Sequence, residues 1–200
     1  YDGLEYLQSE SGWITDQANV PDIVQTEDGL IYLYYTGWLV GKETNKMAVG
    51  ISEDNGETWA LKYVVINDLP AIAPPVDPDV VLLDDGTFRL YFTSGDSVGS
   101  GIYYAEGTDG VNFEYKGGTV RPAETDLINS TTFKIRNEWH MYVMADQSIE
   151  TLWHLISEDG LEWEITRITS FPIDGRPHMP SNGVWIDGEF HLFMSNITDG

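Results

Sequence analysis

The fold of this chain is decided by residues 21–36, which read PDIVQTEDGLIYLYYT. Residues 78–93 repeat that pattern without a gap as PDVVLLDDGTFRLYFT. Two looser copies follow, STTFKIRNEWHMYVM over 130–144 and NGVWIDGEFHLFMS over 182–195. In each copy two apolar runs flank a tight turn, a pattern that is typical of a β-hairpin. The sequence therefore predicts one hairpin that is repeated along the chain.

A second element recurs between the hairpins. It reads SEDNGETW over 52–59, TDGVNF over 108–113 and SEDGLEW over 157–163, and the chain begins with a version, DGLEY, over 2–6. We expect each of these segments to form the turn between the third and fourth strands of a unit. The Asp carboxylate would accept backbone N–H groups, the Gly would take a positive φ, and the aromatic residue would pack between units.

Four-stranded units of about 50 residues without helical periodicity are typical of the blades of a β-propeller. The sequence therefore predicts an all-β fold, a single β-propeller domain over 1–200 in which about four blades are represented. The expected parts are a lone outer strand over 4–8, complete blades over about 20–66, 76–117 and 128–168, and a partial blade over 181–200. The lone strand either completes the last blade by ring closure or belongs to a longer propeller of which this chain is a fragment, and we favour the fragment.

The composition excludes several classes of function. The chain has 200 residues, with 33 Asp and Glu against 10 Lys and Arg, and its formal net charge is −23. Nucleic acids and anionic membranes are not expected as partners, because both are bound through clustered Lys and Arg. At 42% hydrophobic and 12% aromatic residues the chain is too apolar for a disordered segment.

The absence of cysteine excludes disulfides, a thiol nucleophile and a Cys-ligated zinc. Only four His are present and none is paired at ligand spacing, so neither a transition metal nor another cofactor is expected. Carboxylates near the propeller axis could still hold a hard cation such as Ca²⁺. Localisation is left open, with an extracellular or periplasmic site slightly favoured.

Propeller geometry sorts the conspicuous residues onto two faces. The Asp-Gly turns and the Ser-x-Asp turns lie on the face away from the pocket, so Asp28, Asp54, Asp85 and Asp159 are predicted to be structural. The innermost strands begin on the face where the central pocket opens. The candidates expected there are Trp13, Asp16, Asn19, Asp22, Trp38, Asp77, Asp79, Asp96, Arg121, Glu124, Asp126, Asn129, Ser130, Arg176, His178, Ser181 and Asn182.

Carboxylates that converge on a narrow axis repel one another, which raises the pKa of at least one and can create an acid–base pair. Two carboxyl groups about 5.5 Å apart suit double displacement at a sugar, and about 6.5–9.5 Å leaves room for a water nucleophile. Trp13 and Trp38 would suit stacking on a sugar ring. The alternative is that Asp22, Asp79, Ser130 and Asn182 only link neighbouring blades by hydrogen bonds, and that both Trp residues are packing residues.

The hairpins at 21–37 and 76–92 resemble those of the five-bladed propeller glycosidases, the family 43 arabinanase and xylosidase group and its relatives. That resemblance implies three acidic residues on innermost strands: a base Asp, a second Asp that tunes the pKa of the acid and positions it, and a Glu general acid. Asp77, directly before Pro78, matches one family Asp by position.

The other two family positions hold different residues in this chain. Val20 occupies the position of the base, which leaves Asp22 as the candidate base and Asp77 or Asp79 as its pKa partner. The family Glu would fall near Asn129, and an amide cannot donate a proton as a carboxylic acid does. Glu124, or Asp126 in its place, is therefore the provisional acid from the preceding loop.

The SEDNGETW segment at 52–59 also resembles the Asp-box turn of sialidases. Such a turn indicates a fold more than a function. Sialidases bind a carboxylate with three arginines, whereas only Arg121 and Arg176 are expected on the pocket face, so sialidase activity is not favoured.

The sequence thus predicts a glycan-binding propeller that acts as a glycoside hydrolase in its axial pocket. Asn129, Asn182, Arg176, His178 and the two Trp residues would bind the substrate. The alternative is a non-catalytic carbohydrate-binding or scaffold propeller that lacks the general acid. The expected partner is a carbohydrate ligand, with a homo-oligomer as a further expectation if the ring is incomplete.

Overall fold

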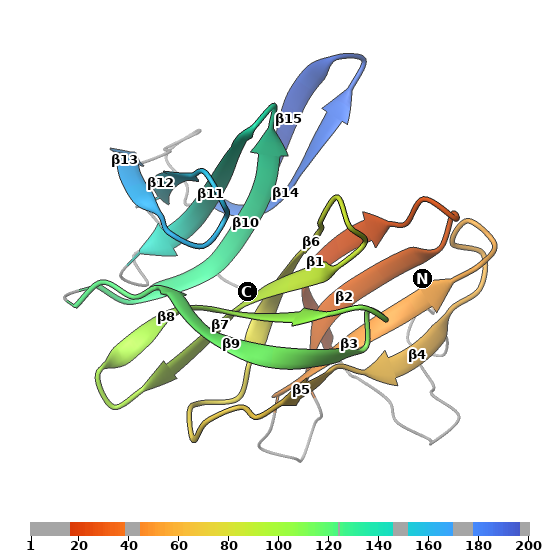
Figure 1. The fold of residues 1–200 in the computed structure, drawn as a ribbon, viewed down its shortest axis with the longest axis horizontal. Coiled ribbons are helices and arrows are strands. Elements are labelled where there is room, and N and C mark those ends of the chain that lie inside the picture. The colour runs from red at the N-terminus through yellow and green to blue at the C-terminus, as the bar shows by residue number, and fades with distance from the viewer. Residues whose placement is uncertain (1–16, 39–44, 124, 146–151, 170–177, 197–200) are drawn as a thin grey trace.

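The computed structural model describes residues 17–38, 45–123, 125–145, 152–169 and 178–196. Within these ranges the chain is all β, with fifteen strands and no helix (Figure 1). A helix long and apolar enough to cross a membrane is accordingly absent from the described part of the chain. The all-β prediction is confirmed.

The strands form sheets in which neighbours in sequence are antiparallel neighbours in space, as expected for alternating apolar runs joined by tight turns. We number these sheets as blades 1 to 4. Blade 1 contains β1 (Gln17–Gln25), β2 (Ile31–Trp38), β3 (Asn45–Ser52) and β4 (Ala60–Tyr63). Blade 2 contains β6 (Val76–Leu82), β7 (Phe88–Asp96), β8 (Gly99–Gly107) and β9 (Asn112–Val120).

Blades 3 and 4 follow the same order. Blade 3 contains β10 (Leu127–Ile135), β11 (Glu138–Ala145), β12 (Leu152–Ser157) and β13 (Glu164–Thr169). Blade 4 is described as the hairpin of β14 (His178–Ile186) and β15 (Glu189–Asn196). Each predicted hairpin is therefore the first pair of strands of one blade.

One strand was not predicted. β5 (Val65–Asn67) lies in the link that leaves blade 1, and it pairs in parallel with β9 at the outer edge of blade 2. Its three residues are too few to show an alternating pattern in the sequence. The pairing covers the edge of blade 2, which would otherwise expose unpaired N–H and C=O groups.

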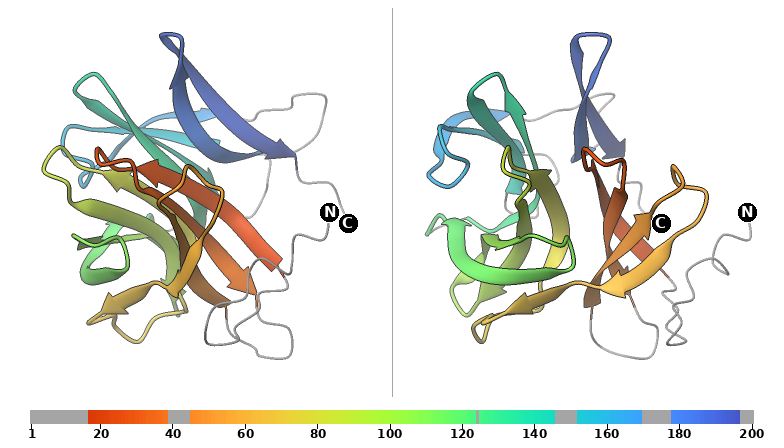
Figure 2. Two further views of the ribbon diagram at one scale, coloured as in Figure 1. Left: turned by 90° about the vertical axis from the view of Figure 1, so that its right-hand side faces the viewer. Right: turned by 45° about the vertical axis from the view of Figure 1, so that its right-hand side comes forward.

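The four sheets are arranged around a common axis, with β1, β6, β10 and β14 innermost (Figures 1 and 2). β6 lies between β1 and β10, and β14 lies beside β10. Direct hydrogen bonds join these strands across blade boundaries, for example from the backbone N–H of Val80 to Asp22 and from that of Thr132 to Asp79. This arrangement is that of a partial propeller.

Each innermost strand contains a β-bulge near its start. The bulges fall between Asn19 and Asp22, Val76 and Asp79, Ile128 and Ser130, and Pro180 and Asn182. In three of them the residue with a left-handed backbone is Val20, Asp77 or Asn129, with φ of 49°, 54° and 56°. A bulge bends its strand and re-aims the side chain, so these three residues are structurally equivalent.

The apolar core lies in layers between successive blades, where face-to-face packing of sheets buries the most area. The layer between blades 1 and 2 includes Tyr32, Tyr34, Val49, Leu90, Phe92 and Phe113. The layer between blades 2 and 3 includes Tyr91, Ile102, Leu127, Met141, Val143 and Leu155. Burial of this area is the main source of stability.

The turn between the third and fourth strands is built by its own polar side chains. In the turn between β3 and β4, Asp54 accepts the backbone N–H of Thr58 at 2.8 Å and the Ser52 hydroxyl at 2.8 Å. These hydrogen bonds favour the ionised carboxylate and lower the pKa of Asp54 to about 2. Asp159 plays the same part in the turn between β12 and β13, where it accepts the N–H of Leu161 at 2.8 Å.

Candidate functional site

The candidate site lies at the bulges of the innermost strands and is organised around a threonine of β7. The Thr93 hydroxyl accepts the backbone N–H of Asn129 at 2.9 Å and donates a hydrogen bond to the carboxylate of Asp77. One blade back, the Thr36 hydroxyl accepts the backbone N–H of Asp77 at 2.8 Å. The bulge residue of one blade is thus held by the second strand of the blade before it.

Asp77 is the bulge carboxylate of this site, and it remains partly exposed. Burial raises its pKa, and the hydrogen bond from Thr93 opposes that rise by favouring the ionised form. A carboxyl group in this balance can hold or release a proton closer to neutrality than a surface aspartate can. Asp77 therefore combines a raised pKa with partial exposure.

Asn129 lies beside Asp77 on the other side of Thr93 and is only 3% exposed. Its side-chain amide donates a long hydrogen bond of 3.4 Å to the carbonyl oxygen of Pro180. Its Oδ1 is buried without a hydrogen-bond partner among the described residues. Such a loosely held amide is unusual, because buried polar atoms in proteins are nearly always paired.

Asp22 and Asp79 each lie two residues after the bulge residue of their strand, which is Val20 in β1 and Asp77 in β6. Their side chains are buried, with Asp22 8% and Asp79 2% exposed. Asp22 accepts the N–H of Val80 at 2.5 Å, that of Ile23 at 2.8 Å and the side-chain amide of Asn182 at 2.5 Å. It therefore links blade 1 to the blades on both sides.

Asp79 makes the corresponding link between blades 2 and 3. It accepts the hydroxyls of Ser130 at 2.8 Å and Thr132 at 2.7 Å, and the backbone N–H of Thr132 at 3.0 Å. Burial raises the pKa of both Asp22 and Asp79, and the negative charge of Asp79 raises that of Asp22 further. Hydrogen bonds received from the neighbouring strands oppose this rise.

A second cluster of polar side chains is formed by the β7–β8 hairpin and the segment that follows β9. Arg121 forms an ion pair with Asp96 at 2.9 Å, and its guanidinium lies 5.1 Å from the ring centroid of Tyr103. Asp126 accepts the backbone N–H of Ser100 at 2.7 Å. Asp126 is therefore tied to the β7–β8 hairpin, and its carboxylate is partly exposed.

The structure brings Asp22, Asp77, Asp79, Asn129 and Asn182 together on the innermost strands. Trp13, Asp16, Glu124 and Arg176 lie outside the described residues. Trp38 ends β2 and His178 begins β14, and only their backbone is described.

Sequence reasoning missed Thr36 and Thr93, although a signal for them was present. Each is the last residue of a copied hairpin, in the runs Tyr-Tyr-Thr and Tyr-Phe-Thr. Their significance depends on the next blade along the chain, because the N–H groups that they bind belong to that blade.

No group of three or more His, Asp or Glu side chains suited to a metal ion occurs within the ranges that the structure describes. The Ca²⁺ ion that the sequence allowed at the axis stays a prediction.

Comparisons with known proteins bear on the fold. No protein-family model matches the chain, and no curated protein matches it either. Several solved structures do match the chain. A family 117 glycoside hydrolase of the marine bacterium Zobellia galactanivorans matches with a TM-score of 0.64 at 18% identity, over 82% of this chain and 49% of that one.

Two further solved structures are similar. A glycosyl hydrolase from Bacteroides ovatus matches with a TM-score of 0.62 at 14% identity, over 90% of this chain and 60% of that one. An exo-β-1,3-galactanase from Clostridium thermocellum matches with a TM-score of 0.70 at 14% identity, over 95% of this chain and 44% of that one. The chain spans about half the length of the family 117 enzyme. At these identities the likeness shows the fold, which is a partial β-propeller of the kind found in glycoside hydrolases.

Proposed function

We propose that this chain binds a glycan at the pocket end of its innermost strands and hydrolyses a glycosidic bond there. The observation that carries the proposal is Asp77, a partly exposed carboxyl group with a raised pKa at a strand bulge, held by Thr93. Enzymes place a carboxyl group of this kind where a proton must be exchanged with the substrate.

Hydrolysis of a glycosidic bond requires two carboxyl groups, one that protonates the leaving oxygen and one that acts as base or nucleophile. We assign one of these roles to Asp77. The second carboxyl group would come from the segment that joins β9 to β10, which contains Glu124 and Asp126.

Asp22 and Asp79 are assigned a different role in this proposal. Each already accepts three hydrogen bonds, all of them from the neighbouring blade for Asp79 and two of them from neighbouring blades for Asp22, and each is less than one-tenth exposed. A base must be free to take a proton from water or substrate. We therefore propose that Asp22 and Asp79 hold the blades together, and that the base predicted at Asp22 lies elsewhere.

The similar solved structures support the choice of substrate class. They include a family 117 glycoside hydrolase and an enzyme that cleaves β-1,3-galactan from its end. We further propose kinship with the family 43 group, on the hairpin motifs and on the family position that Asp77 occupies. The turn at 52–59 is assigned to the Asp-box type on its Ser52–Asp54–Thr58 hydrogen bonds.

A non-catalytic glycan-binding propeller is the second candidate function. The observation that favours it is the identity of the residues equivalent to Asp77, since Val20 and Asn129 occupy the bulges of blades 1 and 3. Neither side chain can exchange a proton at neutral pH. In this form of the site, Asp77 and Asn129 would hydrogen-bond sugar hydroxyls.

The test measures how fast wild type, Asp77→Asn and Asp85→Asn hydrolyse a panel of aryl glycosides. Calorimetry measures how tightly the same three proteins bind the matching oligosaccharides. Asp85 is a matched control, because it is an exposed aspartate in the hairpin turn between β6 and β7. We expect Asp77→Asn to lower kcat by at least about 100-fold, the usual loss when an acid–base group is removed, and Asp85→Asn to leave it unchanged.

The two candidate functions give different outcomes. Turnover that survives Asp77→Asn unchanged would show that Asp77 is not catalytic. Oligosaccharide binding without turnover in wild type, weakened by Asp77→Asn, would favour the non-catalytic propeller. Failure to bind any glycan would contradict both.

A further inference from the structure

Two histidines of blade 3, His140 on β11 and His154 on β12, play no part in the proposed glycan site. Their rings are nearly parallel, with an interplanar angle of 3° and centroids 5.3 Å apart. Nδ1 of His140 lies only 3.0 Å from Nε2 of His154. Because the facing nitrogens are so much closer than the centroids, the rings meet edge to edge, and one proton lies between these two nitrogens.

This pair of imidazoles is extended by a hydrogen-bonding group at each end. Nε2 of His140 lies 3.3 Å from Oε1 of Glu138. Nδ1 of His154 lies 3.0 Å from the hydroxyl of Thr166 on β13. A carboxylate, two imidazoles and a hydroxyl from three adjacent strands therefore form one line, which we call the blade 3 tetrad.

The carboxylate fixes the direction in which the blade 3 tetrad donates its hydrogen bonds. The Glu138 side chain is 54% exposed, and a carboxylate in water only accepts. His140 must then carry its proton on Nε2 and accept at Nδ1. A neutral imidazole has one donor and one acceptor, so His154 donates from Nε2 and accepts the Thr166 hydroxyl at Nδ1.

The Thr166 hydroxyl has one other acceptor within reach, the backbone carbonyl oxygen of His154 at 3.0 Å. Donation to that oxygen would leave Nδ1 of His154 facing a lone pair. Reversing both imidazoles would remove this conflict, but it would point the lone pair of His140 Nε2 at the Glu138 carboxylate. Donation from Thr166 to His154 is therefore the arrangement without a clash of lone pairs.

The surroundings of the pair favour neutral imidazoles. Burial lowers the pKa of His140 and that of His154, and a positive charge on His140 lowers the pKa of His154 further. Blade 4 approaches this side of blade 3 through Phe190, an uncharged side chain that packs on Phe133. The titratable or charged side chains around the two rings are Glu138, Tyr142 and Arg167, with Arg136 and Glu158 in the hollow beside His140.

Thr166 reaches His154 because β13 has a bulge at this point. The register between β12 and β13 shifts between His154 and Leu155, which leaves Thr166 as the extra residue of the bulge. A bulge re-aims the side chain of its extra residue. Thr166 is also exposed, so the blade 3 tetrad ends in a hydroxyl that solvent and small molecules can reach.

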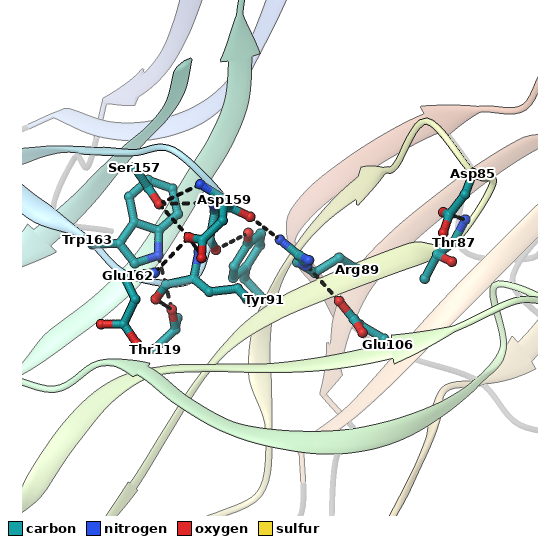
Figure 3. A network of polar contacts seen from close by, with 12 residues as sticks. Asp85, Thr87, Arg89, Tyr91, Glu106, Thr119, Ser157, Asp159, Glu162 and Trp163 are labelled. Atoms are coloured by element: carbon teal, nitrogen blue, oxygen red, sulfur yellow. Dashed lines mark hydrogen bonds and ion pairs between the residues drawn. The ribbon is translucent and has the colours of Figure 1, made fainter. Parts of the chain in front are cut away.

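The equivalent positions of blade 2 join it to the next blade instead (Figure 3). Arg89, which matches His140 in register, donates to the carbonyl oxygen of Asp159 in blade 3 at 2.8 Å. The Tyr91 hydroxyl donates to the carbonyl oxygen of Gly160 at 2.6 Å. The blade 3 tetrad is thus not a repeated feature of the blades.

From this geometry we propose that Thr166 is a nucleophile that takes an acyl group from a carboxylic ester. His154 acts as its base, and His140 and Glu138 are positioning residues. A hydroxyl that is hydrogen-bonded to an imidazole, which a further group orients, is the arrangement that activates a nucleophile. The site lies on the outer strands of blade 3, so it does not depend on the glycan site at the innermost strands.

The hollow next to the blade 3 tetrad indicates which esters suit the site. The glutamates that line it are Glu138, Glu158, Glu162 and Glu164. Their negative charge would repel an anionic ester and attract a cationic one. We therefore expect the acyl donor to be uncharged or cationic.

In the acyl transfer, Oγ1 of Thr166 attacks the ester carbonyl carbon and forms a new C–O bond. The bond to the alcohol or phenol breaks, and its electron pair stays on the leaving oxygen. The hydroxyl proton passes to Nδ1 of His154, and the imidazolium formed then protonates the leaving oxygen or releases the proton to water. The Glu138 charge stabilises that imidazolium through the ring of His140.

Acylation by p-nitrophenyl acetate tests the proposal in the full chain. Peptide mass spectrometry measures the acetyl group on Thr166 and, in the same digest, on Thr58. Thr58 is the internal control, because it is also exposed but donates to the carboxylate of Asp54, at 2.6 Å, and not to an imidazole. We expect Thr166 to react at least about 100-fold faster, the usual contribution of a general base.

Two variants separate the base from the positioning residues. His154→Phe keeps an aromatic ring beside Tyr142 and should lower the acylation rate of Thr166 to that of Thr58. Glu138→Ala leaves the base in place and should give a rate between those of wild type and His154→Phe, because the direction of the hydrogen bonds is then no longer fixed.

The pH profile and the tautomers report on the blade 3 tetrad directly. The acylation rate of wild type should rise with pH and level off below the usual pKa range of histidine, because only neutral His154 accepts the proton and burial lowers its pKa. Nitrogen NMR should show His140 and His154 protonated on Nε2 and bare on Nδ1. In Glu138→Ala this preference should weaken.

Three results would overturn the proposal. Equal acetylation of Thr166 and Thr58 in wild type would show that the hydroxyl is not activated, and this comparison does not depend on the folding of any variant. Acetylation of Thr166 that survives His154→Phe would exclude His154 as the base. A proton on Nδ1 of His154 in the NMR spectrum would show that the hydrogen bonds run in the opposite direction.

Discussion

At the scale of single residues, the candidate site depends on three side chains that the chain keeps far apart in sequence. Asp77, Thr93 and Asn129 meet because the bulges of β6 and β10 are each bound by the second strand of the preceding blade. Asp77 was singled out from the sequence, because its Asp-Pro step resembles that of the family 43 hairpins. Thr93 could not be singled out, because its role is defined by a carboxylate and an N–H group on other strands.

Replacing Thr93 with Val should raise the pKa of Asp77 further. The Thr93 hydroxyl stabilises the ionised carboxylate, and burial already favours the neutral form. If Asp77 acts as the acid, the alkaline limb of the pH–rate profile should move to higher pH, because Asp77 would stay protonated over a wider range. Titration of the Asp77 carboxyl carbon by NMR measures the shift independently of activity.

Two variants control for a general loss of structure. Thr93→Ser keeps the hydroxyl and should restore the wild-type titration. Thr36→Val removes a hydroxyl that binds the Asp77 backbone N–H and should leave the carboxyl titration nearly unchanged. An equal shift in Thr36→Val and Thr93→Val would contradict a specific role for Thr93.

At the scale of elements, the repeated hairpins and turns were predicted with their order, because local patterns suffice for both. Alternating apolar residues specify the strands, and Asp, Gly and Ser specify the turns. The bulges and β5 were not predicted. A bulge is defined by the register of two strands, and β5 is a strand only through pairing with β9.

The turn glycines offer a test of how blades are joined. Gly160→Ala should lower the free energy of unfolding by about 3 kcal/mol, because φ at Gly160 is +75° and a Cβ there would lie 2.8 Å from the Tyr91 hydroxyl. Gly86→Ala is the matched control, with φ of +84° and no heavy atom near the added Cβ. It should cost only the backbone strain, about 1 kcal/mol.

Urea unfolding of both variants measures the difference. Equal losses for the two glycines would mean that the contact between Gly160 and Tyr91 contributes nothing to the junction.

At the scale of the whole molecule, the dominant feature is negative charge. The chain carries 33 acidic residues against 10 basic ones, and several of the described carboxylates are used inside turns or between blades. The ion pairs given by Arg89, Arg121 and Lys134 offset only a small part of the charge. Folding therefore brings many unpaired carboxylates close together.

Salt should accordingly stabilise the protein. Raising NaCl from 0.01 M to about 0.5 M shortens the screening length from about 30 Å to a few ångströms, which weakens repulsion more in the compact state than in the unfolded chain. We expect Tm to rise by several degrees, and KCl at the same ionic strength to give the same rise. A Tm that is flat or falls with salt would show that self-repulsion does not limit stability.

The sequence by itself determined the strands, the turns, their repetition and therefore the propeller class, because each of these depends on residues close together in the chain. It also placed the acid–base candidates at the starts of the innermost strands and in the loop before the third of them. Only the tertiary structure decided which of these carboxylates are accessible and which are already hydrogen-bonded to other blades. Asp22 and Asp79 are occupied by hydrogen bonds from neighbouring blades, whereas Asp77 remains partly exposed. That distinction arises from packing between blades, since the groups that bind each carboxylate are donated by strands dozens of residues away.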